Sequence, residues 1–214
     1  MKYRLLFRII FAFIFSSCSD FSGNEDAVEA SLKPAPVTRN NNNNNNNDTP
    51  TRTYYDLDAI TFGNNTFVAV GERGTVRTSS DNGTTWDNGT SGTTKQLNEI
   101  GYGNSTFVAV GQSGPPLYSS NNGSTWGNGT WSESDWVTGV AFGNNTFIGV
   151  SSTYLTKSTD NGANWSKKAQ GIAVWDVTYG NSKFVASGAN GAIQHSSNDG
   201  ENWTNGNSRT TEET

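Results

Sequence analysis

Residue types on which many enzymes and disulfide-stabilised proteins depend are scarce in this chain of 214 residues. It has one cysteine, Cys18, so an internal disulfide cannot form, and one histidine, His195. These two residues provide no zinc constellation and no recognisable catalytic triad. We therefore expect neither a metal nor a cofactor.

Basic residues are also scarce: 14 Lys and Arg stand against 19 Asp and Glu. Three of the basic residues, Lys2, Arg4 and Arg8, lie at the N-terminus, and without them the formal charge is (14 − 3) − 19 = −8. No basic cluster remains. Phosphate binding depends on concentrated Lys and Arg, so the composition argues against nucleic acid as a partner.

The apolar run at residues 9–15 follows a basic start and precedes Ser16, Ser17 and Cys18. This order predicts a secretory signal peptide, and the run is too short to span a bilayer. The cysteine after two small residues resembles the lipobox of bacterial lipoproteins, with Phe15 where Leu is usual. The resemblance implies a leader at residues 1–17, a lipid on Cys18, and N-terminal anchoring at the outer membrane or cell surface. An ordinary signal peptide with an incidental cysteine is the alternative.

Residues 18–52 are rich in Ser, Gly, Asn, Asp, Glu and Pro, and residues 40–47 are eight consecutive asparagines. Such a segment has too little apolar surface to offset the entropy of ordering it. We predict a disordered tether here and a folded domain at residues 53–214.

The octapeptide SSDNGTTW at residues 79–86 recurs as SSNNGSTW, STDNGANW and SSNDGENW, and its tryptophans are 40, 39 and 38 residues apart. A repeat of this period indicates a repeated structural unit. Asp or Asn followed by Gly favours a tight turn, and Trp fastens the turn to the sheet. Two copies carry Asn in place of Asp, which preserves an oxygen acceptor without the charge. The octapeptide therefore predicts a hairpin corner rather than a catalytic carboxylate.

Each repeat also contains short runs rich in Val, Ile, Phe, Tyr and Thr, bounded by Gly or Asn, which predict strands. The paired runs are residues 57–62 and 66–71, 97–102 and 106–111, 137–142 and 146–150, and 174–179 and 183–188. A third strand before each octapeptide and a weak fourth strand after it complete the unit. The sequence thus predicts an all-β fold, a β-propeller of about four four-stranded blades.

Four blades can close on themselves or leave an open arc that pairs with another copy of the chain. Residues 51–55 and 207–214 are the candidates for completing a blade between the two chain ends. We favour a compact four-blade domain, and a homodimer is the alternative.

The pattern Ser-x-Asp-x-Gly-x-Thr-Trp resembles the Asp-box, or BNR repeat, of the sialidase-like β-propellers over about residues 55–206. The first copy matches every fixed position, and later copies depart at Asn121, Asn164, Asn198 and Asn202. The resemblance implies a structural corner between the third and fourth strands of a blade, away from the ligand face. The positions so assigned are Ser79, Asp81, Gly83, Thr85, Trp86, Ser119, Asn121, Gly123, Trp126, Ser158, Asp160, Gly162, Trp165, Ser196, Asn198, Gly200 and Trp203.

The same resemblance suggests sialidase activity, which in that family needs three arginines, a Tyr nucleophile with a Glu, an Asp acid/base and an Arg-Ile-Pro motif. Beyond the leader the chain has only Arg39, Arg52, Arg73, Arg77 and Arg209, and no proline follows an isoleucine. We therefore expect no sialidase chemistry. A divergent glycoside hydrolase would need a carboxylate pair, for which Glu133 and Asp135 are the candidates.

Antiparallel strand order places the remaining turns and the variable connections between blades at the end opposite the octapeptides, where binding residues normally lie. The candidate ligand-binding residues at this end are Trp131, Glu133, Asp135, Tyr154 and Arg73. We expect Trp131, and less strongly Tyr154, to be exposed aromatic surfaces. We expect Trp136 and Trp175 to pack between blades.

The sequence thus favours a lipid-anchored, non-catalytic binding module of the cell envelope that recognises a glycan or a protein. The alternatives are the divergent hydrolase and a scaffold role, as in the photosystem II assembly factors, whose propellers carry a similar repeat.

Overall fold

The computed structural model of the chain describes residues 55–131, 136–169 and 173–208. The predicted leader, Cys18 and the asparagine-rich tether lie outside these residues. Blade 1 consists of β1 (Leu57–Gly63), β2 (Thr66–Gly71), β3 (Thr75–Ser79) and β4 (Asp87–Thr90), and blade 2 of β5 (Leu97–Gly103), β6 (Thr106–Gly111), β7 (Leu117–Ser119) and β8 (Gly127–Asn128). Blade 3 consists of β9 (Gly139–Gly143), β10 (Thr146–Val150), β11 (Tyr154–Ser158) and β12 (Ser166–Ala169), and blade 4 of β13 (Val174–Gly180), β14 (Lys183–Gly188), β15 (Ile193–Ser196) and β16 (Thr204–Asn205).

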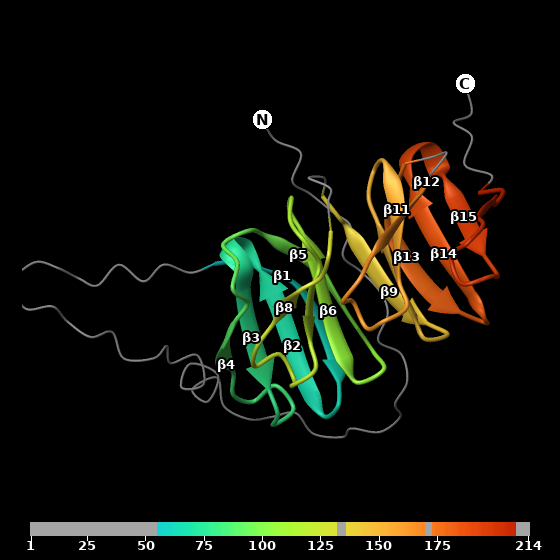
Figure 1. Cartoon of the computed structure of the whole chain (residues 1–214). Coiled ribbons are helices and arrows are strands. Elements are labelled where there is room, and N and C mark those ends of the chain that lie inside the picture. The colour runs from blue at the N-terminus through green and yellow to red at the C-terminus, as the bar shows by residue number, and fades with distance from the viewer. Residues whose placement is uncertain (1–54, 132–135, 170–172, 209–214) are drawn as a thin grey trace, which may run out of the picture. The chain divides into compact units, whose positions relative to one another are not determined.

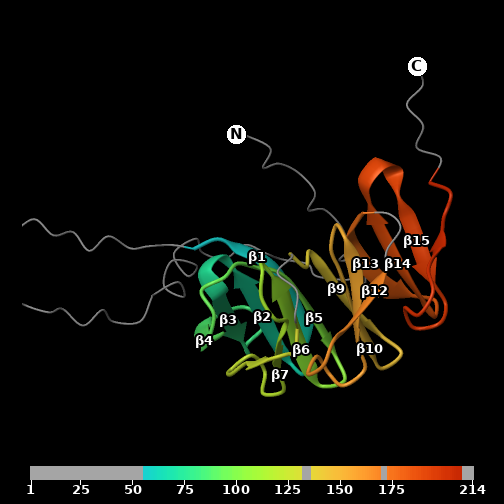
Figure 2. The same cartoon turned by 45° about the horizontal axis from the view of Figure 1, so that its top comes forward.

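Each blade is a four-stranded antiparallel sheet whose strands follow one another in chain order. The first strands of consecutive blades pack together, β1 with β5, β5 with β9, and β9 with β13 (Figures 1 and 2). The predicted all-β propeller of four blades is therefore confirmed. Two 3-10 turns, η1 (Glu72–Gly74) and η2 (Ala189–Gly191), complete the described elements, and none of these is a helix long and apolar enough to cross a membrane.

The core lies between the blades, in three layers. We call the face of a blade that is turned toward the preceding blade its upstream face, and the opposite one its downstream face. Val68 and Val70 on the downstream face of blade 1, for example, pack against Ile100 and Phe107 on the upstream face of blade 2. Equivalent clusters join blade 2 to blade 3 and blade 3 to blade 4. Each blade is thus stabilised mainly by its neighbours, as in other repeat proteins.

The blades form a series with two uncovered outer faces. Among the described residues, no packing comparable to that of β1 with β5 joins β13 to β1. Leu57, Ile60 and Phe62 on the upstream face of blade 1 are 45%, 57% and 51% exposed. The described residues of the four blades therefore have the open arrangement and not the compact four-blade domain that the sequence favoured.

The GNN-type turns between the first two strands of each blade are two-residue hairpin loops. In blade 1, Gly63 pairs with Thr66, and the two loop residues Asn64 and Asn65 have φ of 45° and 56°. Positive φ at both positions is the signature of the type I′ turn, whose twist matches that of the flanking strands. Asparagine tolerates this conformation better than most residues, which explains its abundance in these loops.

The octapeptides form hairpin corners between the third and fourth strands, as predicted. In blade 1 the Ser79 hydroxyl donates to Asp81 Oδ1 (2.8 Å) and accepts the N–H of Gly83 (2.9 Å). The Trp86 indole N–H donates to the carbonyl of Gly83 (3.0 Å) and so closes the corner. Blades 2, 3 and 4 repeat these three bonds. The motif thus satisfies its own polar groups, which is a structural role.

The Asp81 carboxylate gives the first corner a pH dependence. Hydrogen bonds from the Thr85 hydroxyl, the Thr85 amide and the Ser79 hydroxyl lower the pKa of Asp81 from 3.8 to about 2. Because the folded pKa is depressed, this stabilisation is complete above pH 3.8 and is lost as the pH falls through about 2.

We expect Asp81→Asn to remove this part of the acid sensitivity, because Asn121 fills the same position in blade 2 and accepts the Thr125 amide (3.0 Å). Urea unfolding at several pH values checks it. The difference in unfolding free energy between wild type and variant should be constant above pH 3.8 and move against the wild type down to pH about 2. A difference that stays flat through this window would contradict the assignment.

Candidate binding surface at the loop end of the propeller

The turns between the second and third strands and the connections between blades lie at one end of the molecule, opposite the hairpin corners (Figure 1). We call this the loop end. Blades 1 and 4 make the same turn there: η1 and η2 each have a left-handed central residue, Arg73 and Asn190, both with φ of 53°. Blades 2 and 3 have turns of different sequence and conformation. The loop end therefore varies from blade to blade on a constant scaffold.

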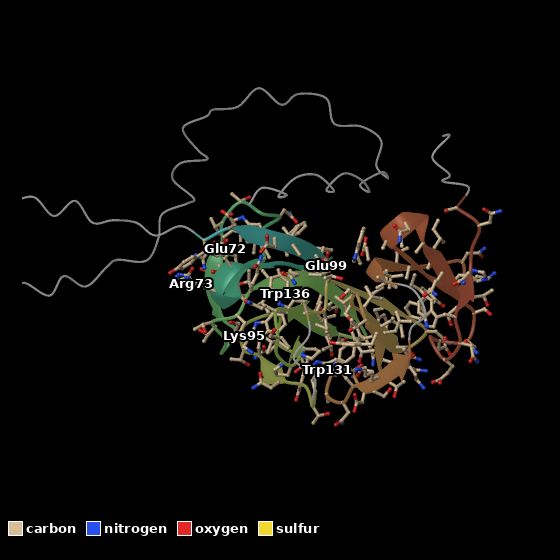
Figure 3. All side chains as sticks on the ribbon, turned by 90° about the horizontal axis from the view of Figure 1, so that it is seen from above. Glu72, Arg73, Lys95, Glu99, Trp131 and Trp136 are labelled. Carbon is tan, nitrogen blue, oxygen red and sulfur yellow. The ribbon has the colours of Figure 1, made fainter. Side chains whose placement is uncertain are left out.

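Arg73 is exposed at the tip of η1, at one side of the loop end (Figure 3). Its guanidinium lies over the ring of Tyr55, 5.5 Å from the ring centre, which is within cation–π range. The turn is fixed to the start of blade 1, since the Glu72 amide donates to the Asp56 carbonyl (2.9 Å). Arg73 is thus a solvent-facing cation whose position is fixed by its turn and by the Tyr55 ring, which suits a binding residue.

Tyr154 and Trp131 are brought together, but not as free surfaces. The Tyr154 side chain is completely buried, and its amide donates to the Ser151 hydroxyl (3.1 Å) at the start of β11. The Trp131 ring packs on it at 5.3 Å between centres and is itself half-buried, and the Lys167 ammonium lies 4.6 Å from the Tyr154 ring centre. The predicted exposure of Tyr154 is therefore wrong, and Trp131 presents only part of its surface. Glu133 and Asp135 lie outside the described residues.

Trp136 and Trp175 are the exposed indoles of the loop end, at 47% and 55% exposure. The prediction that they pack between blades is wrong. Trp175 is skipped in the pairing of β13, where Val174 pairs with Gly188 and Asp176 with Ser187. Such a bulge redirects its side chain. The Thr138 hydroxyl donates to the carbonyl of Trp175 (2.7 Å), which joins the entry to blade 3, just after Trp136, to the bulge of blade 4.

Aligning the repeats provides a signal for this exposure. Trp175 stands where the earlier blades have the polar residues Asp58, Asn98 and Thr138. Trp136 stands where the other blades have Asp56, Gln96 and Ala173. A tryptophan at a position that is otherwise polar or small is expected to face solvent. Closeness to a strand, on which the prediction for these two tryptophans rested, does not reveal which way a side chain points.

A small pocket opens beside the connection into blade 2. Its polar lining includes Lys95, Gln96 and Gln112, with Pro115 and Leu117 as apolar neighbours. The Lys95 ammonium donates to the carbonyl of Ser113 and so bridges the two loops. Figure 3 shows Lys95 between Arg73 and the centre of the loop end. The pocket thus adds a second cation and hydrogen-bonding amides to the surface.

Two carboxylates of the loop end are engaged with the backbone. Glu99 Oε1 accepts the amide of Ile100 (3.0 Å), and Asp176 Oδ1 accepts the amide of Val177 (2.7 Å). Within the described residues, no group of three or more His, Cys, Asp or Glu is placed to hold a metal ion. The surface instead offers what non-covalent recognition uses: exposed aromatic rings, cations and amides.

Fold and surface together define a β-propeller repeat protein with a variable loop end. No protein-family model matches the sequence, and no curated protein matches it. Among solved structures, the fold is similar to YCF48 from Cyanidioschyzon merolae, with 19% identity and a TM-score of 0.57 over 73% of this chain and 57% of that one. It is also similar to YCF48 bound to a D1 peptide, with 15% identity and a TM-score of 0.55 over 70% of this chain and 52% of that one.

A computationally designed protein, Ika4, has 11% identity and a TM-score of 0.56 over 68% of this chain and 93% of the design. These likenesses support the propeller fold. The chain thus spans 57% of the first YCF48 structure and nearly the whole of the smaller design.

Proposed function

We propose that this chain is a non-catalytic binding module that holds an extended segment of a partner protein on its loop end. The proposal rests on two exposed indoles, Trp136 and Trp175. The Thr138 hydroxyl, two residues after Trp136, donates to the carbonyl of Trp175 (2.7 Å) and so joins the two segments. Tryptophan and arginine are over-represented among the residues that dominate binding energy. Arg73 and Lys95 add cations at the same end of the propeller (Figure 3).

A peptide ligand is favoured over a glycan by two features. The backbone amides and carbonyls of the variable turns, together with Gln96 and Gln112, can pair with a peptide backbone. In addition, a propeller of similar fold, YCF48, is known with a bound D1 peptide. A glycan stacked on the same indoles is the alternative.

The proposed location of this module rests on the N-terminal sequence. We propose that the segment ending at Cys18 is a lipoprotein leader and that residues 18–52 hold the propeller away from an envelope membrane. The resemblance of the octapeptides to the Asp-box supports a scaffold that is stabilised at the hairpin corners and binds at the opposite end. Palmitate labelling of the full chain, with Cys18→Ser as the control, tests the anchor.

The binding proposal is tested by panning the full chain against a phage-displayed library of random linear peptides and by probing a broad glycan array in parallel. We expect selected peptides, with Trp136→Ala and Trp175→Ala each weakening their binding about 30-fold, equivalent to about 2 kcal/mol. Val185→Ala, which trims an exposed apolar side chain in the middle of β14, is the matched control and should bind normally.

Glycan signals abolished by the same tryptophan variants, without peptide selection, would favour the lectin alternative. Peptide binding that neither tryptophan variant changes would contradict the assignment of the surface.

A further inference from the structure

The two outer faces of the blade series differ from ordinary protein surface. Blade 1 keeps on its upstream face the residues that are buried between blades elsewhere in the chain. The rings of Phe62 and Phe67 lie 4.7 Å apart between centres in a tilted arrangement, as do those of Phe142 and Phe147 in blade 3. Phe147 is fully buried and Phe142 half-buried, whereas their counterparts in blade 1, Phe67 and Phe62, are half-buried and 51% exposed. An apolar face of this kind normally marks an interaction surface.

Three contacts recur at every junction between blades. At each of the two outer faces, only one of the two partners of each contact is present. The first is a ring lying over a glycine of the preceding blade. A Cβ added to Gly63, Gly103 or Gly143 would lie 2.2, 2.0 or 2.1 Å from the ring of Tyr102, Phe142 or Tyr179, respectively. The same atom added to Gly180 in blade 4 would meet nothing within 4 Å. The space beside Gly180 is thus an unfilled slot for an aromatic ring, and the Phe62 ring lies over no glycine of a preceding blade.

The second contact places the corner glycine of one blade on an aliphatic side chain of the preceding blade. A Cβ on Gly123, Gly162 or Gly200 would come within 3.2, 2.9 or 2.4 Å of Val68, Val108 or Ile148, respectively. At the outer faces the corresponding residues are uncovered. Gly83 meets only the Trp86 ring of its own corner, and Val185 is 36% exposed.

The third contact is a side-chain hydrogen bond from a hairpin loop to the corner of the next blade. Asn64 donates to Asn122 (2.9 Å), Asn104 to Asn161 (2.7 Å) and Asn144 to Asp199 (2.8 Å). The next donor in this series is Asn181, whose φ of 47° matches those of the other three, and the missing acceptor is Asn82. Both are exposed.

From these three half-contacts we infer that the downstream face of blade 4 docks on the upstream face of blade 1 in a second copy of this chain. A second copy is the expected partner because the contact would repeat the junction that joins consecutive blades within the chain. Among the described blades, only blade 4 has an uncovered downstream face. Phe62 of one copy would enter the slot at Gly180 of the other, with Asn181 beside Asn82. The inference concerns a surface other than the loop end and does not depend on the proposed function.

Two copies are expected to close into one ring. This chain spans 57% of one propeller of similar fold and 52% of another, built of WD40 repeats in RRP9. Four blades therefore correspond to about half of such propellers. A head-to-tail contact closes when its rotation completes a circle and otherwise makes a filament. Ser187 stands where blades 1 to 3 have Val70, Val110 and Val150. This junction buries less apolar surface, so the dimer should be reversible.

Sedimentation equilibrium of the full chain carrying Cys18→Ser, in a density-matched mild detergent, tests the inference. We expect a monomer–dimer equilibrium that is weakened at least about tenfold by Gly180→Leu and by Phe62→Lys. Neither change should alter the folding of the monomer, because Gly180 has open space and Phe62 is exposed. A monomer at all concentrations, or a dimer that neither variant weakens, would overturn the inference. Species larger than a dimer would overturn closure by two copies.

Cross-linking distinguishes this contact from a symmetric one between two blade 1 faces. In the Cys18→Ser chain, Asn82→Cys and Asn181→Cys proteins are mixed and treated with a short bis-maleimide. We expect a cross-linked dimer from the mixture and none from either protein alone. Asn144→Cys with Asp199→Cys in one chain is the matched intrachain control, since these side chains are already bonded. Cross-linking of Asn82→Cys alone would contradict the head-to-tail arrangement.

Discussion

Gly103→Ala is expected to lower the free energy of unfolding by about 3 kcal/mol, the upper end of the usual cost of overpacking. The Cβ of the new residue would lie 2.0 Å from the ring of Phe142 in the next blade. The φ of Gly103 is not positive, so the penalty is steric and not conformational. Urea unfolding monitored by tryptophan fluorescence measures this loss of unfolding free energy.

Gly180→Ala is the matched control because it has the same repeat position in blade 4 and nothing within 4 Å of the added atom. Measured at a concentration at which the chain is monomeric, its effect should stay within about 0.5 kcal/mol. Equal losses for the two variants would mean that the glycines serve the hairpin loops and not the contact between blades.

Phe147→Ala is expected to cost about 3–5 kcal/mol, as for other large side chains removed from a packed core. The Phe147 ring is completely buried in the layer between blades 2 and 3, where it meets Val108 and Val110. Phe67→Ala removes the equivalent ring of blade 1, which is only half-buried, and should cost less than about 2 kcal/mol. Chemical denaturation of both variants checks the difference.

The location of Phe147 also predicts a change in cooperativity. Blades contact only their neighbours in the series, so the middle layer couples the first two blades to the last two. Weakening it should broaden the transition and lower the denaturant m-value in Phe147→Ala, because the two halves then unfold less cooperatively. An unchanged m-value together with a loss of about 4 kcal/mol would mean that the four blades still unfold as one unit.

Contacts between blades explain the stability of this protein and underlie its proposed association. Inside the chain, a glycine such as Gly143 accommodates the ring of Tyr179 from the next blade. At the outer faces the same residue types stand without partners, as Phe62 and Gly180 do. A repeat protein that ends in this way either caps its outer faces with polar residues or pairs them. Blade 4 is partly capped by Ser187, whereas blade 1 keeps its apolar side chains.

The repeat period and its local turns were determined by the sequence alone. The spacing of Trp86, Trp126, Trp165 and Trp203 identified four units. Short runs rich in Val, Ile, Phe, Tyr and Thr, bounded by Gly or Asn, predicted the strands of each unit. The hairpin corners were predictable because their hydrogen bonds join residues within the octapeptide, such as Ser79 with Asp81. Local interactions of this kind need no knowledge of neighbouring blades. The leader and tether remain predictions, because they lie outside the described residues.

Only the tertiary structure decided which aromatic residues face solvent and whether the blade series closes. Tyr154 and Trp131 cover each other across a loop, and the exposure of Trp175 depends on a bulge in β13. The open faces of blades 1 and 4 depend on how far each blade turns relative to the last, which no single repeat encodes. Exposure and closure are properties of packing between repeats, whereas the repeat itself is a property of the chain.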